Sequence, residues 1–186
     1  MKTIATPLEG LVVIEPRIFG DNRGFFLETH HRQRYRDCGI DRIFVQDNLS
    51  FSVKGTLRGL HFQITKPQAK LVQALTGEIF DVAVDIRPHS TTFGQWFGIR
   101  LSEHNKCQLF IPEGFAHGFC VLSEGAHFSY KCSEYYDPQD EGGILWSDRG
   151  LGIDWPIKSP ILSEKDSRFP CLADLAPDIL TRWQAD

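Results

Sequence analysis

The chain is dominated by short runs of β-branched and aromatic residues that are separated by turn-forming residues. Runs of this kind predict strands. Many short strands with frequent turns favour a double-sheet jelly roll. An immunoglobulin-like sandwich is the alternative, but its usual Cys…Trp…Cys spacing is missing. The predicted strands cover residues 11–19, 25–30, 43–52, 55–63, 70–87, 94–102, 108–123 and 126–136.

Helical signals are few. One short helix is predicted over residues 30–39, and a second over 172–184, where Pro177 interrupts the pattern. No repeat, low-complexity block or long polar linker divides the chain. We therefore expect one all-β domain over residues 1–186, with a few short helices that lie mainly towards the C-terminus.

Turn residues add local detail to this prediction. The sequences GDNRG at 20–24 and TGE at 76–78 both predict hairpin turns. The stretch EIFDVAVDIR at 78–87 alternates as a strand should, so Asp81 and Asp85 share the face opposite the two valines. That face carries charge among small apolar residues.

Composition excludes several classes of function. The net charge is -4 and the isoelectric point is near 6.0, whereas a general nucleic-acid partner needs a cationic face. No apolar run approaches membrane length, and the first ten residues contain no apolar signal segment. The five cysteines are scattered, with no C-x-x-C pair, which is typical of reduced thiols. The sequence thus predicts a cytoplasmic protein without a nucleic-acid or membrane partner.

The stretch LRGLHFQ, residues 57–63, contains the first candidate for chemistry. In an extended strand Gly59, His61 and Gln63 share one face, and Gly59 leaves open space in front of the imidazole. That arrangement suits a pocket wall, although a lone histidine is more often structural. Strict alternation puts Arg58 on the opposite face, so either a bulge intervenes or Arg58 binds something outside the barrel.

A second stretch, IPEGFAHGF, supplies His117. G-L-H and P-x-G-x-x-H together resemble the two motifs of cupins, jelly rolls in which both histidines usually bind a metal. A full cupin metal site has the pattern H-x-H, followed a few residues later by a carboxylate. Here Gln63 stands in place of the second histidine of that pattern, and the cation Lys70 follows where the carboxylate is expected. Two imidazoles beside an ammonium make a poor site for a divalent metal. We therefore expect a cupin-like barrel with no metal.

Histidine, lysine and tyrosine can act together without a metal. A neutral imidazole is a general base, an ammonium stabilises an oxyanion, and a phenol delivers a proton. This combination fits proton abstraction next to a carbonyl through an enolate, and it needs no cofactor. Residues 126–136 offer three tyrosines, Tyr130, Tyr135 and Tyr136, and spacing alone does not choose among them.

Longer stretches resemble the dTDP-4-dehydrorhamnose 3,5-epimerase family. The resemblance implies a metal-free, cupin-like jelly roll that forms homodimers. It also implies a substrate, a dTDP-linked 4-keto-6-deoxyhexose, whose C3 and C5 flank the ketone and are both inverted. The matching stretches are FGDNRGFFLE (19–28), FVQDNLS (44–50), LRGLHFQ (57–63), KLVQALTGEIFDVAVDIRPHSTTFGQW (70–96), IPEGFAHGF (111–119), YKCSEYYDP (130–138), EGGILWSD (141–148) and LSEKD (162–166).

The resemblance also implies roles for single residues. His61 resembles the general base, and Asp166 resembles the carboxylate that orients its imidazole. Lys70 resembles the cation near the C4 oxygen. Tyr130 resembles the acid that reprotonates the sugar from the opposite face.

Eight further positions match substrate contacts of the family. Two of them, in the N-terminal segment, reach a neighbouring subunit's site in the family because that segment is exchanged between subunits. The cations among the eight suit a diphosphate. The positions are Arg23, Glu28, Gln46 and Asn48 for the nucleotide and sugar, and Arg58, His117, Glu141 and Lys165 for further contacts, with Arg23 and Glu28 on the exchanged segment.

Other functions remain open at this point. Relatives with the same residues invert only one carbon, C3 or C5, or act on another nucleotide sugar. A sugar ketoisomerase, which moves the carbonyl, is a further alternative. A metal-dependent cupin would use His61 and His117 as ligands. A non-catalytic sugar-nucleotide-binding module is the last alternative, although binding alone needs neither an acid nor a base.

Overall fold

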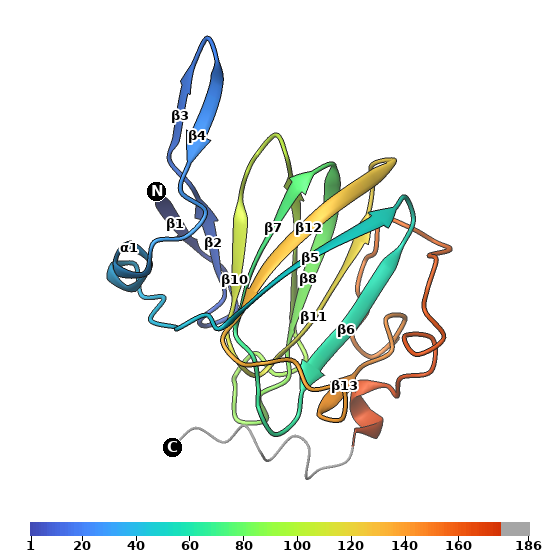
Figure 1. Cartoon of the computed structure of the whole chain (residues 1–186). Helices are drawn as coiled ribbons and strands as arrows, with labels where there is room; N and C mark the ends of the chain where they lie inside the picture. Colours follow the sequence, from blue (N-terminus) through green and yellow to red (C-terminus); the bar gives the residue numbers. More distant parts are fainter. Residues whose placement is uncertain (176–186) are drawn as a thin grey trace.

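Two antiparallel sheets packed face to face form the body of the molecule (Figure 1). The computed structural model of the chain describes residues 1–175. The six-stranded sheet contains, in spatial order, β1 (Lys2–Ala5), β2 (Val12–Glu15), β10 (Gln108–Ile111), β7 (Lys70–Thr76), β12 (Gly125–Cys132) and β5 (Gln46–Val53). The five-stranded sheet contains β13 (Glu141–Gly143), β6 (Leu57–Gln63), β11 (Phe115–Val121), β8 (Glu78–Asp85) and β9 (Trp96–Ser102). This architecture confirms the predicted jelly roll.

A separate two-stranded hairpin, β3 (Ile18–Asp21) and β4 (Gly24–Leu27), projects away from the barrel (Figure 1). Asp21 pairs with Gly24 at its tip, so the turn predicted from GDNRG is confirmed. Gly24 has φ +135°, a backbone conformation that favours glycine.

The helices are short. Helix α1 (Arg32–Asp37) confirms the prediction over residues 30–39. At the other end, residues 1–175 contain a single 3₁₀ turn, Leu172–Asp174, and the rest of the predicted helix over 172–184 lies outside the described residues. Within this range the α-helix thus lies near the N-terminus rather than the C-terminus. No helix of residues 1–175 has the length and apolar character needed to cross a membrane.

The hairpin predicted at TGE is wrong. Strand β7 ends at Thr76 in the six-stranded sheet, and β8 starts at Glu78 in the five-stranded sheet. Gly77, at φ +73°, therefore turns the chain from one sheet into the other, where a Cβ would lie 2.2 Å from the carbonyl oxygen of Gly125. A corner between sheets needs the same left-handed residue as a hairpin, so the local sequence does not distinguish them.

Two predicted strands were also too long, and two edge strands were missed. Pro16 separates β2 from β3, and a turn at Gly114 separates β10 from β11. Proline removes a backbone donor, and glycine at φ +82° breaks the extended path. The missed strands, β1 and β13, are short edge strands with little apolar alternation.

The core is divided between the two faces of the five-stranded sheet. Along β8, Ile79 and Ala83 face the opposite sheet, whereas Val82 and Val84 face the C-terminal segment that includes Trp155. The predicted alternation of this strand is therefore confirmed. Full burial of each large apolar side chain contributes about 1.5–3 kcal/mol. Because both faces of the five-stranded sheet are packed, this sheet forms a fixed wall on one side of the space between the two sheets.

Candidate active site

A cavity of about 270 Å³ lies between the two sheets. Five strands supply most of its lining, and the loop after β12 and strand β13 close one end. On β5 strict alternation turns Gln46, Asn48 and Ser50 inward. The lining residues are Gln46, Asn48, Ser50, Arg58, His61, Phe62, Gln63, Gln68, Lys70, His117, Phe119, Phe128, Tyr130, Cys132, Tyr136 and Glu141.

Strand β6 brings Arg58 and His61 to the same cavity because its register shifts. His117 on β11 pairs with His61, and Phe119 pairs with Arg58, so three steps along β6 match two steps along β11. This is the bulge that the sequence left open, and it cancels strict alternation. Arg58 lines the cavity, and its Nε donates a hydrogen bond to Ser52 Oγ at 3.0 Å.

The role expected for Gly59 was wrong. A Cβ at this position would lie 2.5 Å from the Gly118 Cα, so the glycine permits close packing of β6 on β11. It does not leave open space in front of the imidazole. The bulge and this close approach together set where His61 emerges.

His61 is held by a buried carboxylate. Its Nε2 lies 2.6 Å from Asp166 Oδ1, and its ring meets Phe169 edge-on at 5.7 Å. Burial works to raise the pKa of Asp166, but the hydrogen bond from His61 and the nearby charges hold that pKa below its usual value. Asp166 is therefore an anion that accepts a hydrogen bond from Nε2, and in the neutral imidazole this arrangement leaves the lone pair on Nδ1.

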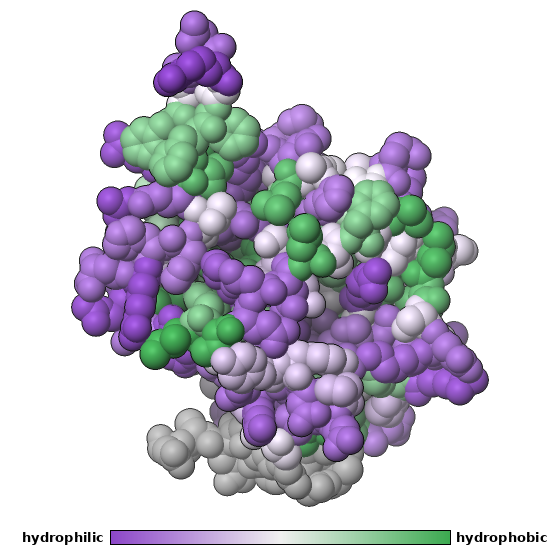
Figure 2. Space-filling view, viewed as in Figure 1, coloured by the Kyte–Doolittle hydropathy of each residue, from purple (hydrophilic) through white to green (hydrophobic). Residues whose placement is uncertain are grey.

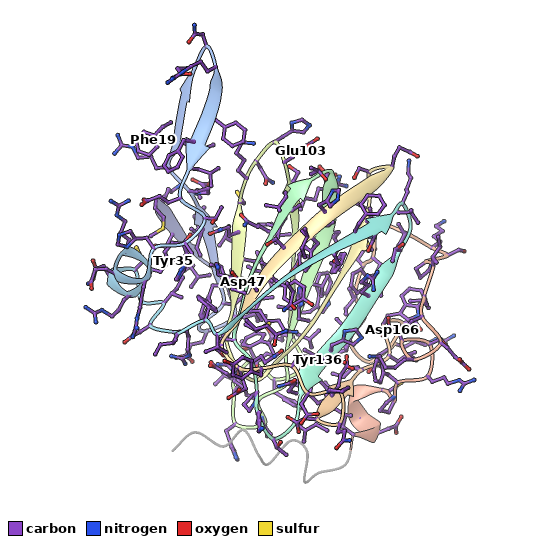
Figure 3. All side chains as sticks on the ribbon, viewed as in Figure 1. Phe19, Tyr35, Asp47, Glu103, Tyr136 and Asp166 are labelled. Carbon is purple, nitrogen blue, oxygen red and sulfur yellow. The ribbon has the colours of Figure 1, made fainter. Side chains whose placement is uncertain are left out.

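Glu141 faces that second nitrogen. Its Oε1 lies 3.7 Å from His61 Nδ1, while Oε2 accepts hydrogen bonds from Lys165 Nζ at 2.5 Å and from the Tyr136 hydroxyl at 2.8 Å. Burial acts to raise the pKa of Glu141, but these two hydrogen bonds lower it overall. The carboxylate therefore stays charged beside the imidazole. Figure 3 labels Tyr136 and Asp166 at the end of the barrel where β6 and β13 lie.

Lys70 and Tyr130 project from the opposite sheet. Tyr130 lies on β12, and Lys70 on the adjacent β7 pairs with Cys132. Burial lowers the pKa of Lys70, although Cys132, Glu141 and Asp81 partly counter it. Burial raises the pKa of Tyr130, which therefore keeps its proton near neutral pH. The cavity thus has an imidazole on one wall and a protonated phenol on the other.

His117 is a buried neighbour of this group. Its Nε2 lies 3.0 and 3.1 Å from the two oxygens of Asp81, and its ring stacks on Phe128 at 6.0 Å. Burial lowers the pKa of His117, and the attraction of Asp81 opposes that effect. The alternation of β8 predicts that Asp81 lies on an otherwise apolar face. The contact with His117 gives this buried charge a polar partner.

Two inward residues of β5 form a polar edge of the cavity. Gln46 Nε2 donates to Asn48 Oδ1 at 2.9 Å, and Gln46 Oε1 accepts from the Tyr136 backbone N–H at 2.9 Å. Asn48 Nδ2 contacts Cys132 Sγ at 3.7 Å. These amides offer donors and acceptors to a polar ligand, and Gln46 also fixes the loop that carries Tyr136.

Arg23 and Glu28 do not join the other site residues within one chain. Arg23 lies at the tip of the projecting hairpin, where its side chain is 85% exposed and its guanidinium binds Asp21 at 2.5 Å. Glu28 follows the hairpin and pairs with Arg34 of α1. Neither lines the cavity. Lys165 and Asp166 lie behind the lining and reach it through Glu141 and His61.

Within residues 1–175 no three His, Cys, Asp or Glu side chains are placed to hold a metal. Each cavity histidine instead has a carboxylate neighbour on Nε2, Asp166 for His61 and Asp81 for His117. The absence of a metal remains a prediction that chelation can test.

Sequence reasoning missed three contributors to the site. Tyr136 was one of three tyrosines without a distinguishing signal, and Cys132 was not singled out. Gln63 was noted only as a replaced ligand, but its amide donates to the carbonyls of Lys66 and Tyr135 at 2.7 and 3.2 Å. Its Oε1 accepts from the Asp137 N–H at 2.7 Å, so the side chain ties two loops at the cavity mouth. Only tertiary contacts reveal this role.

A base, a cation and a phenol around one cavity of a jelly roll are arranged to move protons on carbon, which is the chemistry of the epimerase class of isomerases. Comparison with known proteins gives the particular family. The sequence model described as dTDP-4-dehydrorhamnose 3,5-epimerase matches residues 5–174. The chain belongs to the dTDP-4-dehydrorhamnose 3,5-epimerase family.

Individual relatives agree with this assignment. The dTDP-4-dehydrorhamnose 3,5-epimerase of Methanothermobacter thermautotrophicus is 51% identical over 174 residues, which cover 92% of this chain and 94% of that protein. The enzyme of the same name from Salmonella typhimurium is 53% identical over 175 residues, with 92% and 96% covered. A solved dTDP-6-deoxy-D-glucose-3,5-epimerase from Legionella pneumophila, in complex with dTDP-4-keto-L-rhamnose, superposes with a TM-score of 0.96. It is 52% identical, and 99% of each chain is covered.

Proposed function

We propose that the chain inverts C3 and C5 of dTDP-4-dehydro-6-deoxyglucose, giving dTDP-4-dehydrorhamnose, with His61 as base, Lys70 as enolate stabiliser and Tyr130 as acid. The observation that supports these roles most is the position of His61 and Tyr130 on opposite sheets around one cavity. Inversion needs a base and an acid on opposite faces of the sugar ring, and a ring between the two sheets meets that condition.

Each step follows from the chemistry of the residues. His61 Nδ1 takes the proton from the carbon next to the ketone, and Asp166 stabilises the imidazolium that forms. The ketone oxygen gains charge as the enolate develops, and the Lys70 ammonium stabilises that charge in a site with little water. Tyr130 then delivers its proton to the other face of the carbon.

The remaining cavity residues fit the binding of a nucleotide sugar. Arg58 and the amides of Gln46 and Asn48 suit diphosphate and hydroxyl groups, and His117 and Lys165 lie close by. Arg23 and Glu28 complete the site only from another subunit. We place the enzyme in the cytoplasm, in keeping with its five free cysteines.

Turnover of dTDP-4-keto-6-deoxyglucose in D2O, followed by NMR, tests the reaction. The expected product carries deuterium at both C3 and C5, because each proton removed by His61 is replaced from groups that exchange with solvent. Deuterium at one carbon would indicate a single-site epimerase, and a carbonyl at C3 would indicate a ketoisomerase. Full turnover after dialysis against a chelator is expected, whereas loss of turnover that zinc or iron restores would support the metal-dependent alternative.

A homodimer with an exchanged N-terminal segment completes the proposal. The outward residues of β5 alternate with its cavity residues, yet Leu49, Phe51 and Val53 are 63%, 56% and 51% exposed. Figure 2 shows apolar side chains gathered on the projecting hairpin and over the face of the six-stranded sheet turned to the viewer. Exposed apolar surface of this kind marks an interface, and a second copy of the chain would cover it.

A complementation experiment tests the exchange. Arg23→Ala and His61→Ala are each expected to be nearly inactive alone. After unfolding and refolding as a mixture, half of the dimers are mixed, and one of their two sites receives both Arg23 and His61 if the hairpin is exchanged. Activity should return to about a quarter of the wild-type value. If the hairpin serves its own chain, or if the protein is a monomer, mixing restores nothing.

A further inference from the structure

The base of this reaction has to be reset within one turnover. In the proposed function, on which this inference rests, His61 removes one proton from C3 and a second proton from C5 while the sugar stays bound. After the first removal His61 is an imidazolium and has no lone pair. It must lose that proton before it can act again, and a bound nucleotide sugar blocks water from the cavity.

One carboxylate connects the working nitrogen of His61 with the surface. Glu141 has an 11% exposed side chain, and its Oε1 is the atom 3.7 Å from Nδ1. Its Oε2 accepts the hydrogen bond of the Tyr136 hydroxyl at 2.8 Å. Tyr136 is 49% exposed, so its hydroxyl can exchange protons with water. The chain of contacts therefore runs from the partly buried base to solvent without passing through the substrate.

The loop around Tyr136 is fixed by side chains. Gln46 holds the backbone N–H of Tyr136, and Gln63 holds the carbonyl before it and the N–H after it. Three consecutive residues of an otherwise exposed loop are thus anchored by two glutamines. Such anchoring keeps the phenol in contact with Glu141. Gln63, which stands where metal-binding cupins have a histidine, therefore serves to anchor this loop.

We propose that Glu141 and Tyr136 form a proton relay that returns His61 to its neutral form between the two inversions. The N–H bond of the imidazolium breaks as an O–H bond forms on Glu141, which leaves neutral imidazole and a carboxylic acid. The carboxylic acid then turns its O–H towards the Tyr136 oxygen, and the Tyr136 hydroxyl turns its own hydrogen from Glu141 towards water. The phenolic proton leaves to water as the proton of the acid arrives on the tyrosine oxygen. Glutamate and tyrosine end in their starting states, and one proton has reached solvent.

The electrostatics of Glu141 suit a group that passes a proton on rather than one that keeps it. Hydrogen bonds from Lys165 and Tyr136 outweigh burial and hold its pKa below the usual value, so the carboxyl keeps a proton only briefly. Burial and the bond to Glu141 raise the pKa of Tyr136 to about 12, so the phenol passes protons without resting as a phenolate. Neither residue has to touch the reacting carbons.

Tyr136→Phe tests the relay because it removes one hydroxyl and keeps the ring. The assay follows dTDP-4-keto-6-deoxyglucose in D2O by NMR, at early times and at completion. The first inversion is expected to stay within about threefold of wild type, and the second to slow by about tenfold or more. A singly inverted sugar with deuterium at one carbon should accumulate, and added imidazole buffer should restore the second step.

Two further variants sharpen the result. Tyr135→Phe changes the neighbouring tyrosine, which lies outside the cavity lining, and should show no accumulation. Glu141→Gln breaks the relay at its first link and should accumulate the same singly inverted sugar, together with weaker substrate binding. If Tyr136→Phe gives the same ratio of singly to doubly inverted sugar as wild type, or loses both inversions equally, the relay is overturned. Failure of the wild-type protein to label both carbons would instead overturn the proposed function.

Discussion

Replacing His61 with alanine is expected to lower kcat by about 10²- to 10⁴-fold, because the variant loses the group that removes the α-proton in the proposed mechanism. The side chain is held by Asp166 at 2.6 Å, so its removal also leaves a buried anion without its partner. The measurement is turnover of the dTDP-linked ketosugar, together with exchange of its α-protons in D2O. Both should fall together, since both need the same proton removal.

Two companion variants separate chemistry from folding. Asp166→Asn keeps the shape of the pair but no longer stabilises an imidazolium, and we expect a loss of about 10²-fold or more in kcat with little change in KM. His104→Ala alters a histidine whose side chain is 89% exposed and should leave both values unchanged. Normal exchange of the α-protons in His61→Ala would remove His61 as the base.

Strand periodicity explains why the architecture could be predicted. Alternation along residues 78–87 assigned each side chain to one of two faces, and both faces are buried as expected. The site was harder, because its partners are distant in sequence. Asp166 lies 105 residues after His61, so no local pattern links the two residues, and only the family resemblance predicts the pair.

Other features depend on contacts that no local pattern encodes. Gly77 satisfies a hairpin and an intersheet corner equally well, and only the pairing of β7 with β10 and β12 decides between them. The position of Arg58 depends on how β6 fits against β11, where the side-chain-free Gly59 allows close approach. Tyr136 gains its importance from Glu141, Gln46 and a shared loop geometry. Tertiary packing overrides local preference at such points.

The proposed exchange of the N-terminal segment links the cavity to the projecting hairpin. In the proposed dimer, the cavity of one chain would receive Arg23 from the projecting hairpin of the other chain and Glu28 from the residue that follows that hairpin. The exposed apolar residues of β5 lie on the outer side of the same strand that lines the cavity. Dimerisation would therefore cover the apolar face and complete the site in a single event, which links assembly to activity.

Lys70→Met is expected to lower kcat by about 10²- to 10³-fold, because the enolate loses its cation while the volume of the side chain is nearly kept. KM should change less, since the ketone oxygen carries full charge only during the reaction. Lys70→Arg keeps the charge but places it differently, and partial activity is expected. Equal kcat in Lys70→Met and in wild type would show that another group stabilises the enolate.

The pH dependence of kcat gives an independent test of Lys70. In the proposed mechanism only the charged ammonium stabilises the enolate, so activity should fall as pH rises through the pKa of this lysine. Burial lowers that pKa, so the fall should begin at lower pH than an exposed lysine would give. Burial raises the pKa of Tyr130, which moves loss of its proton to higher pH than in an exposed tyrosine. Burial also raises the pKa of Cys132, which lies next to Lys70. Cys132→Ser should keep the alkaline fall, whereas Lys70→Arg should move it upwards because guanidinium stays charged. An alkaline fall that disappears in Cys132→Ser and persists in Lys70→Arg would assign it to the thiol instead.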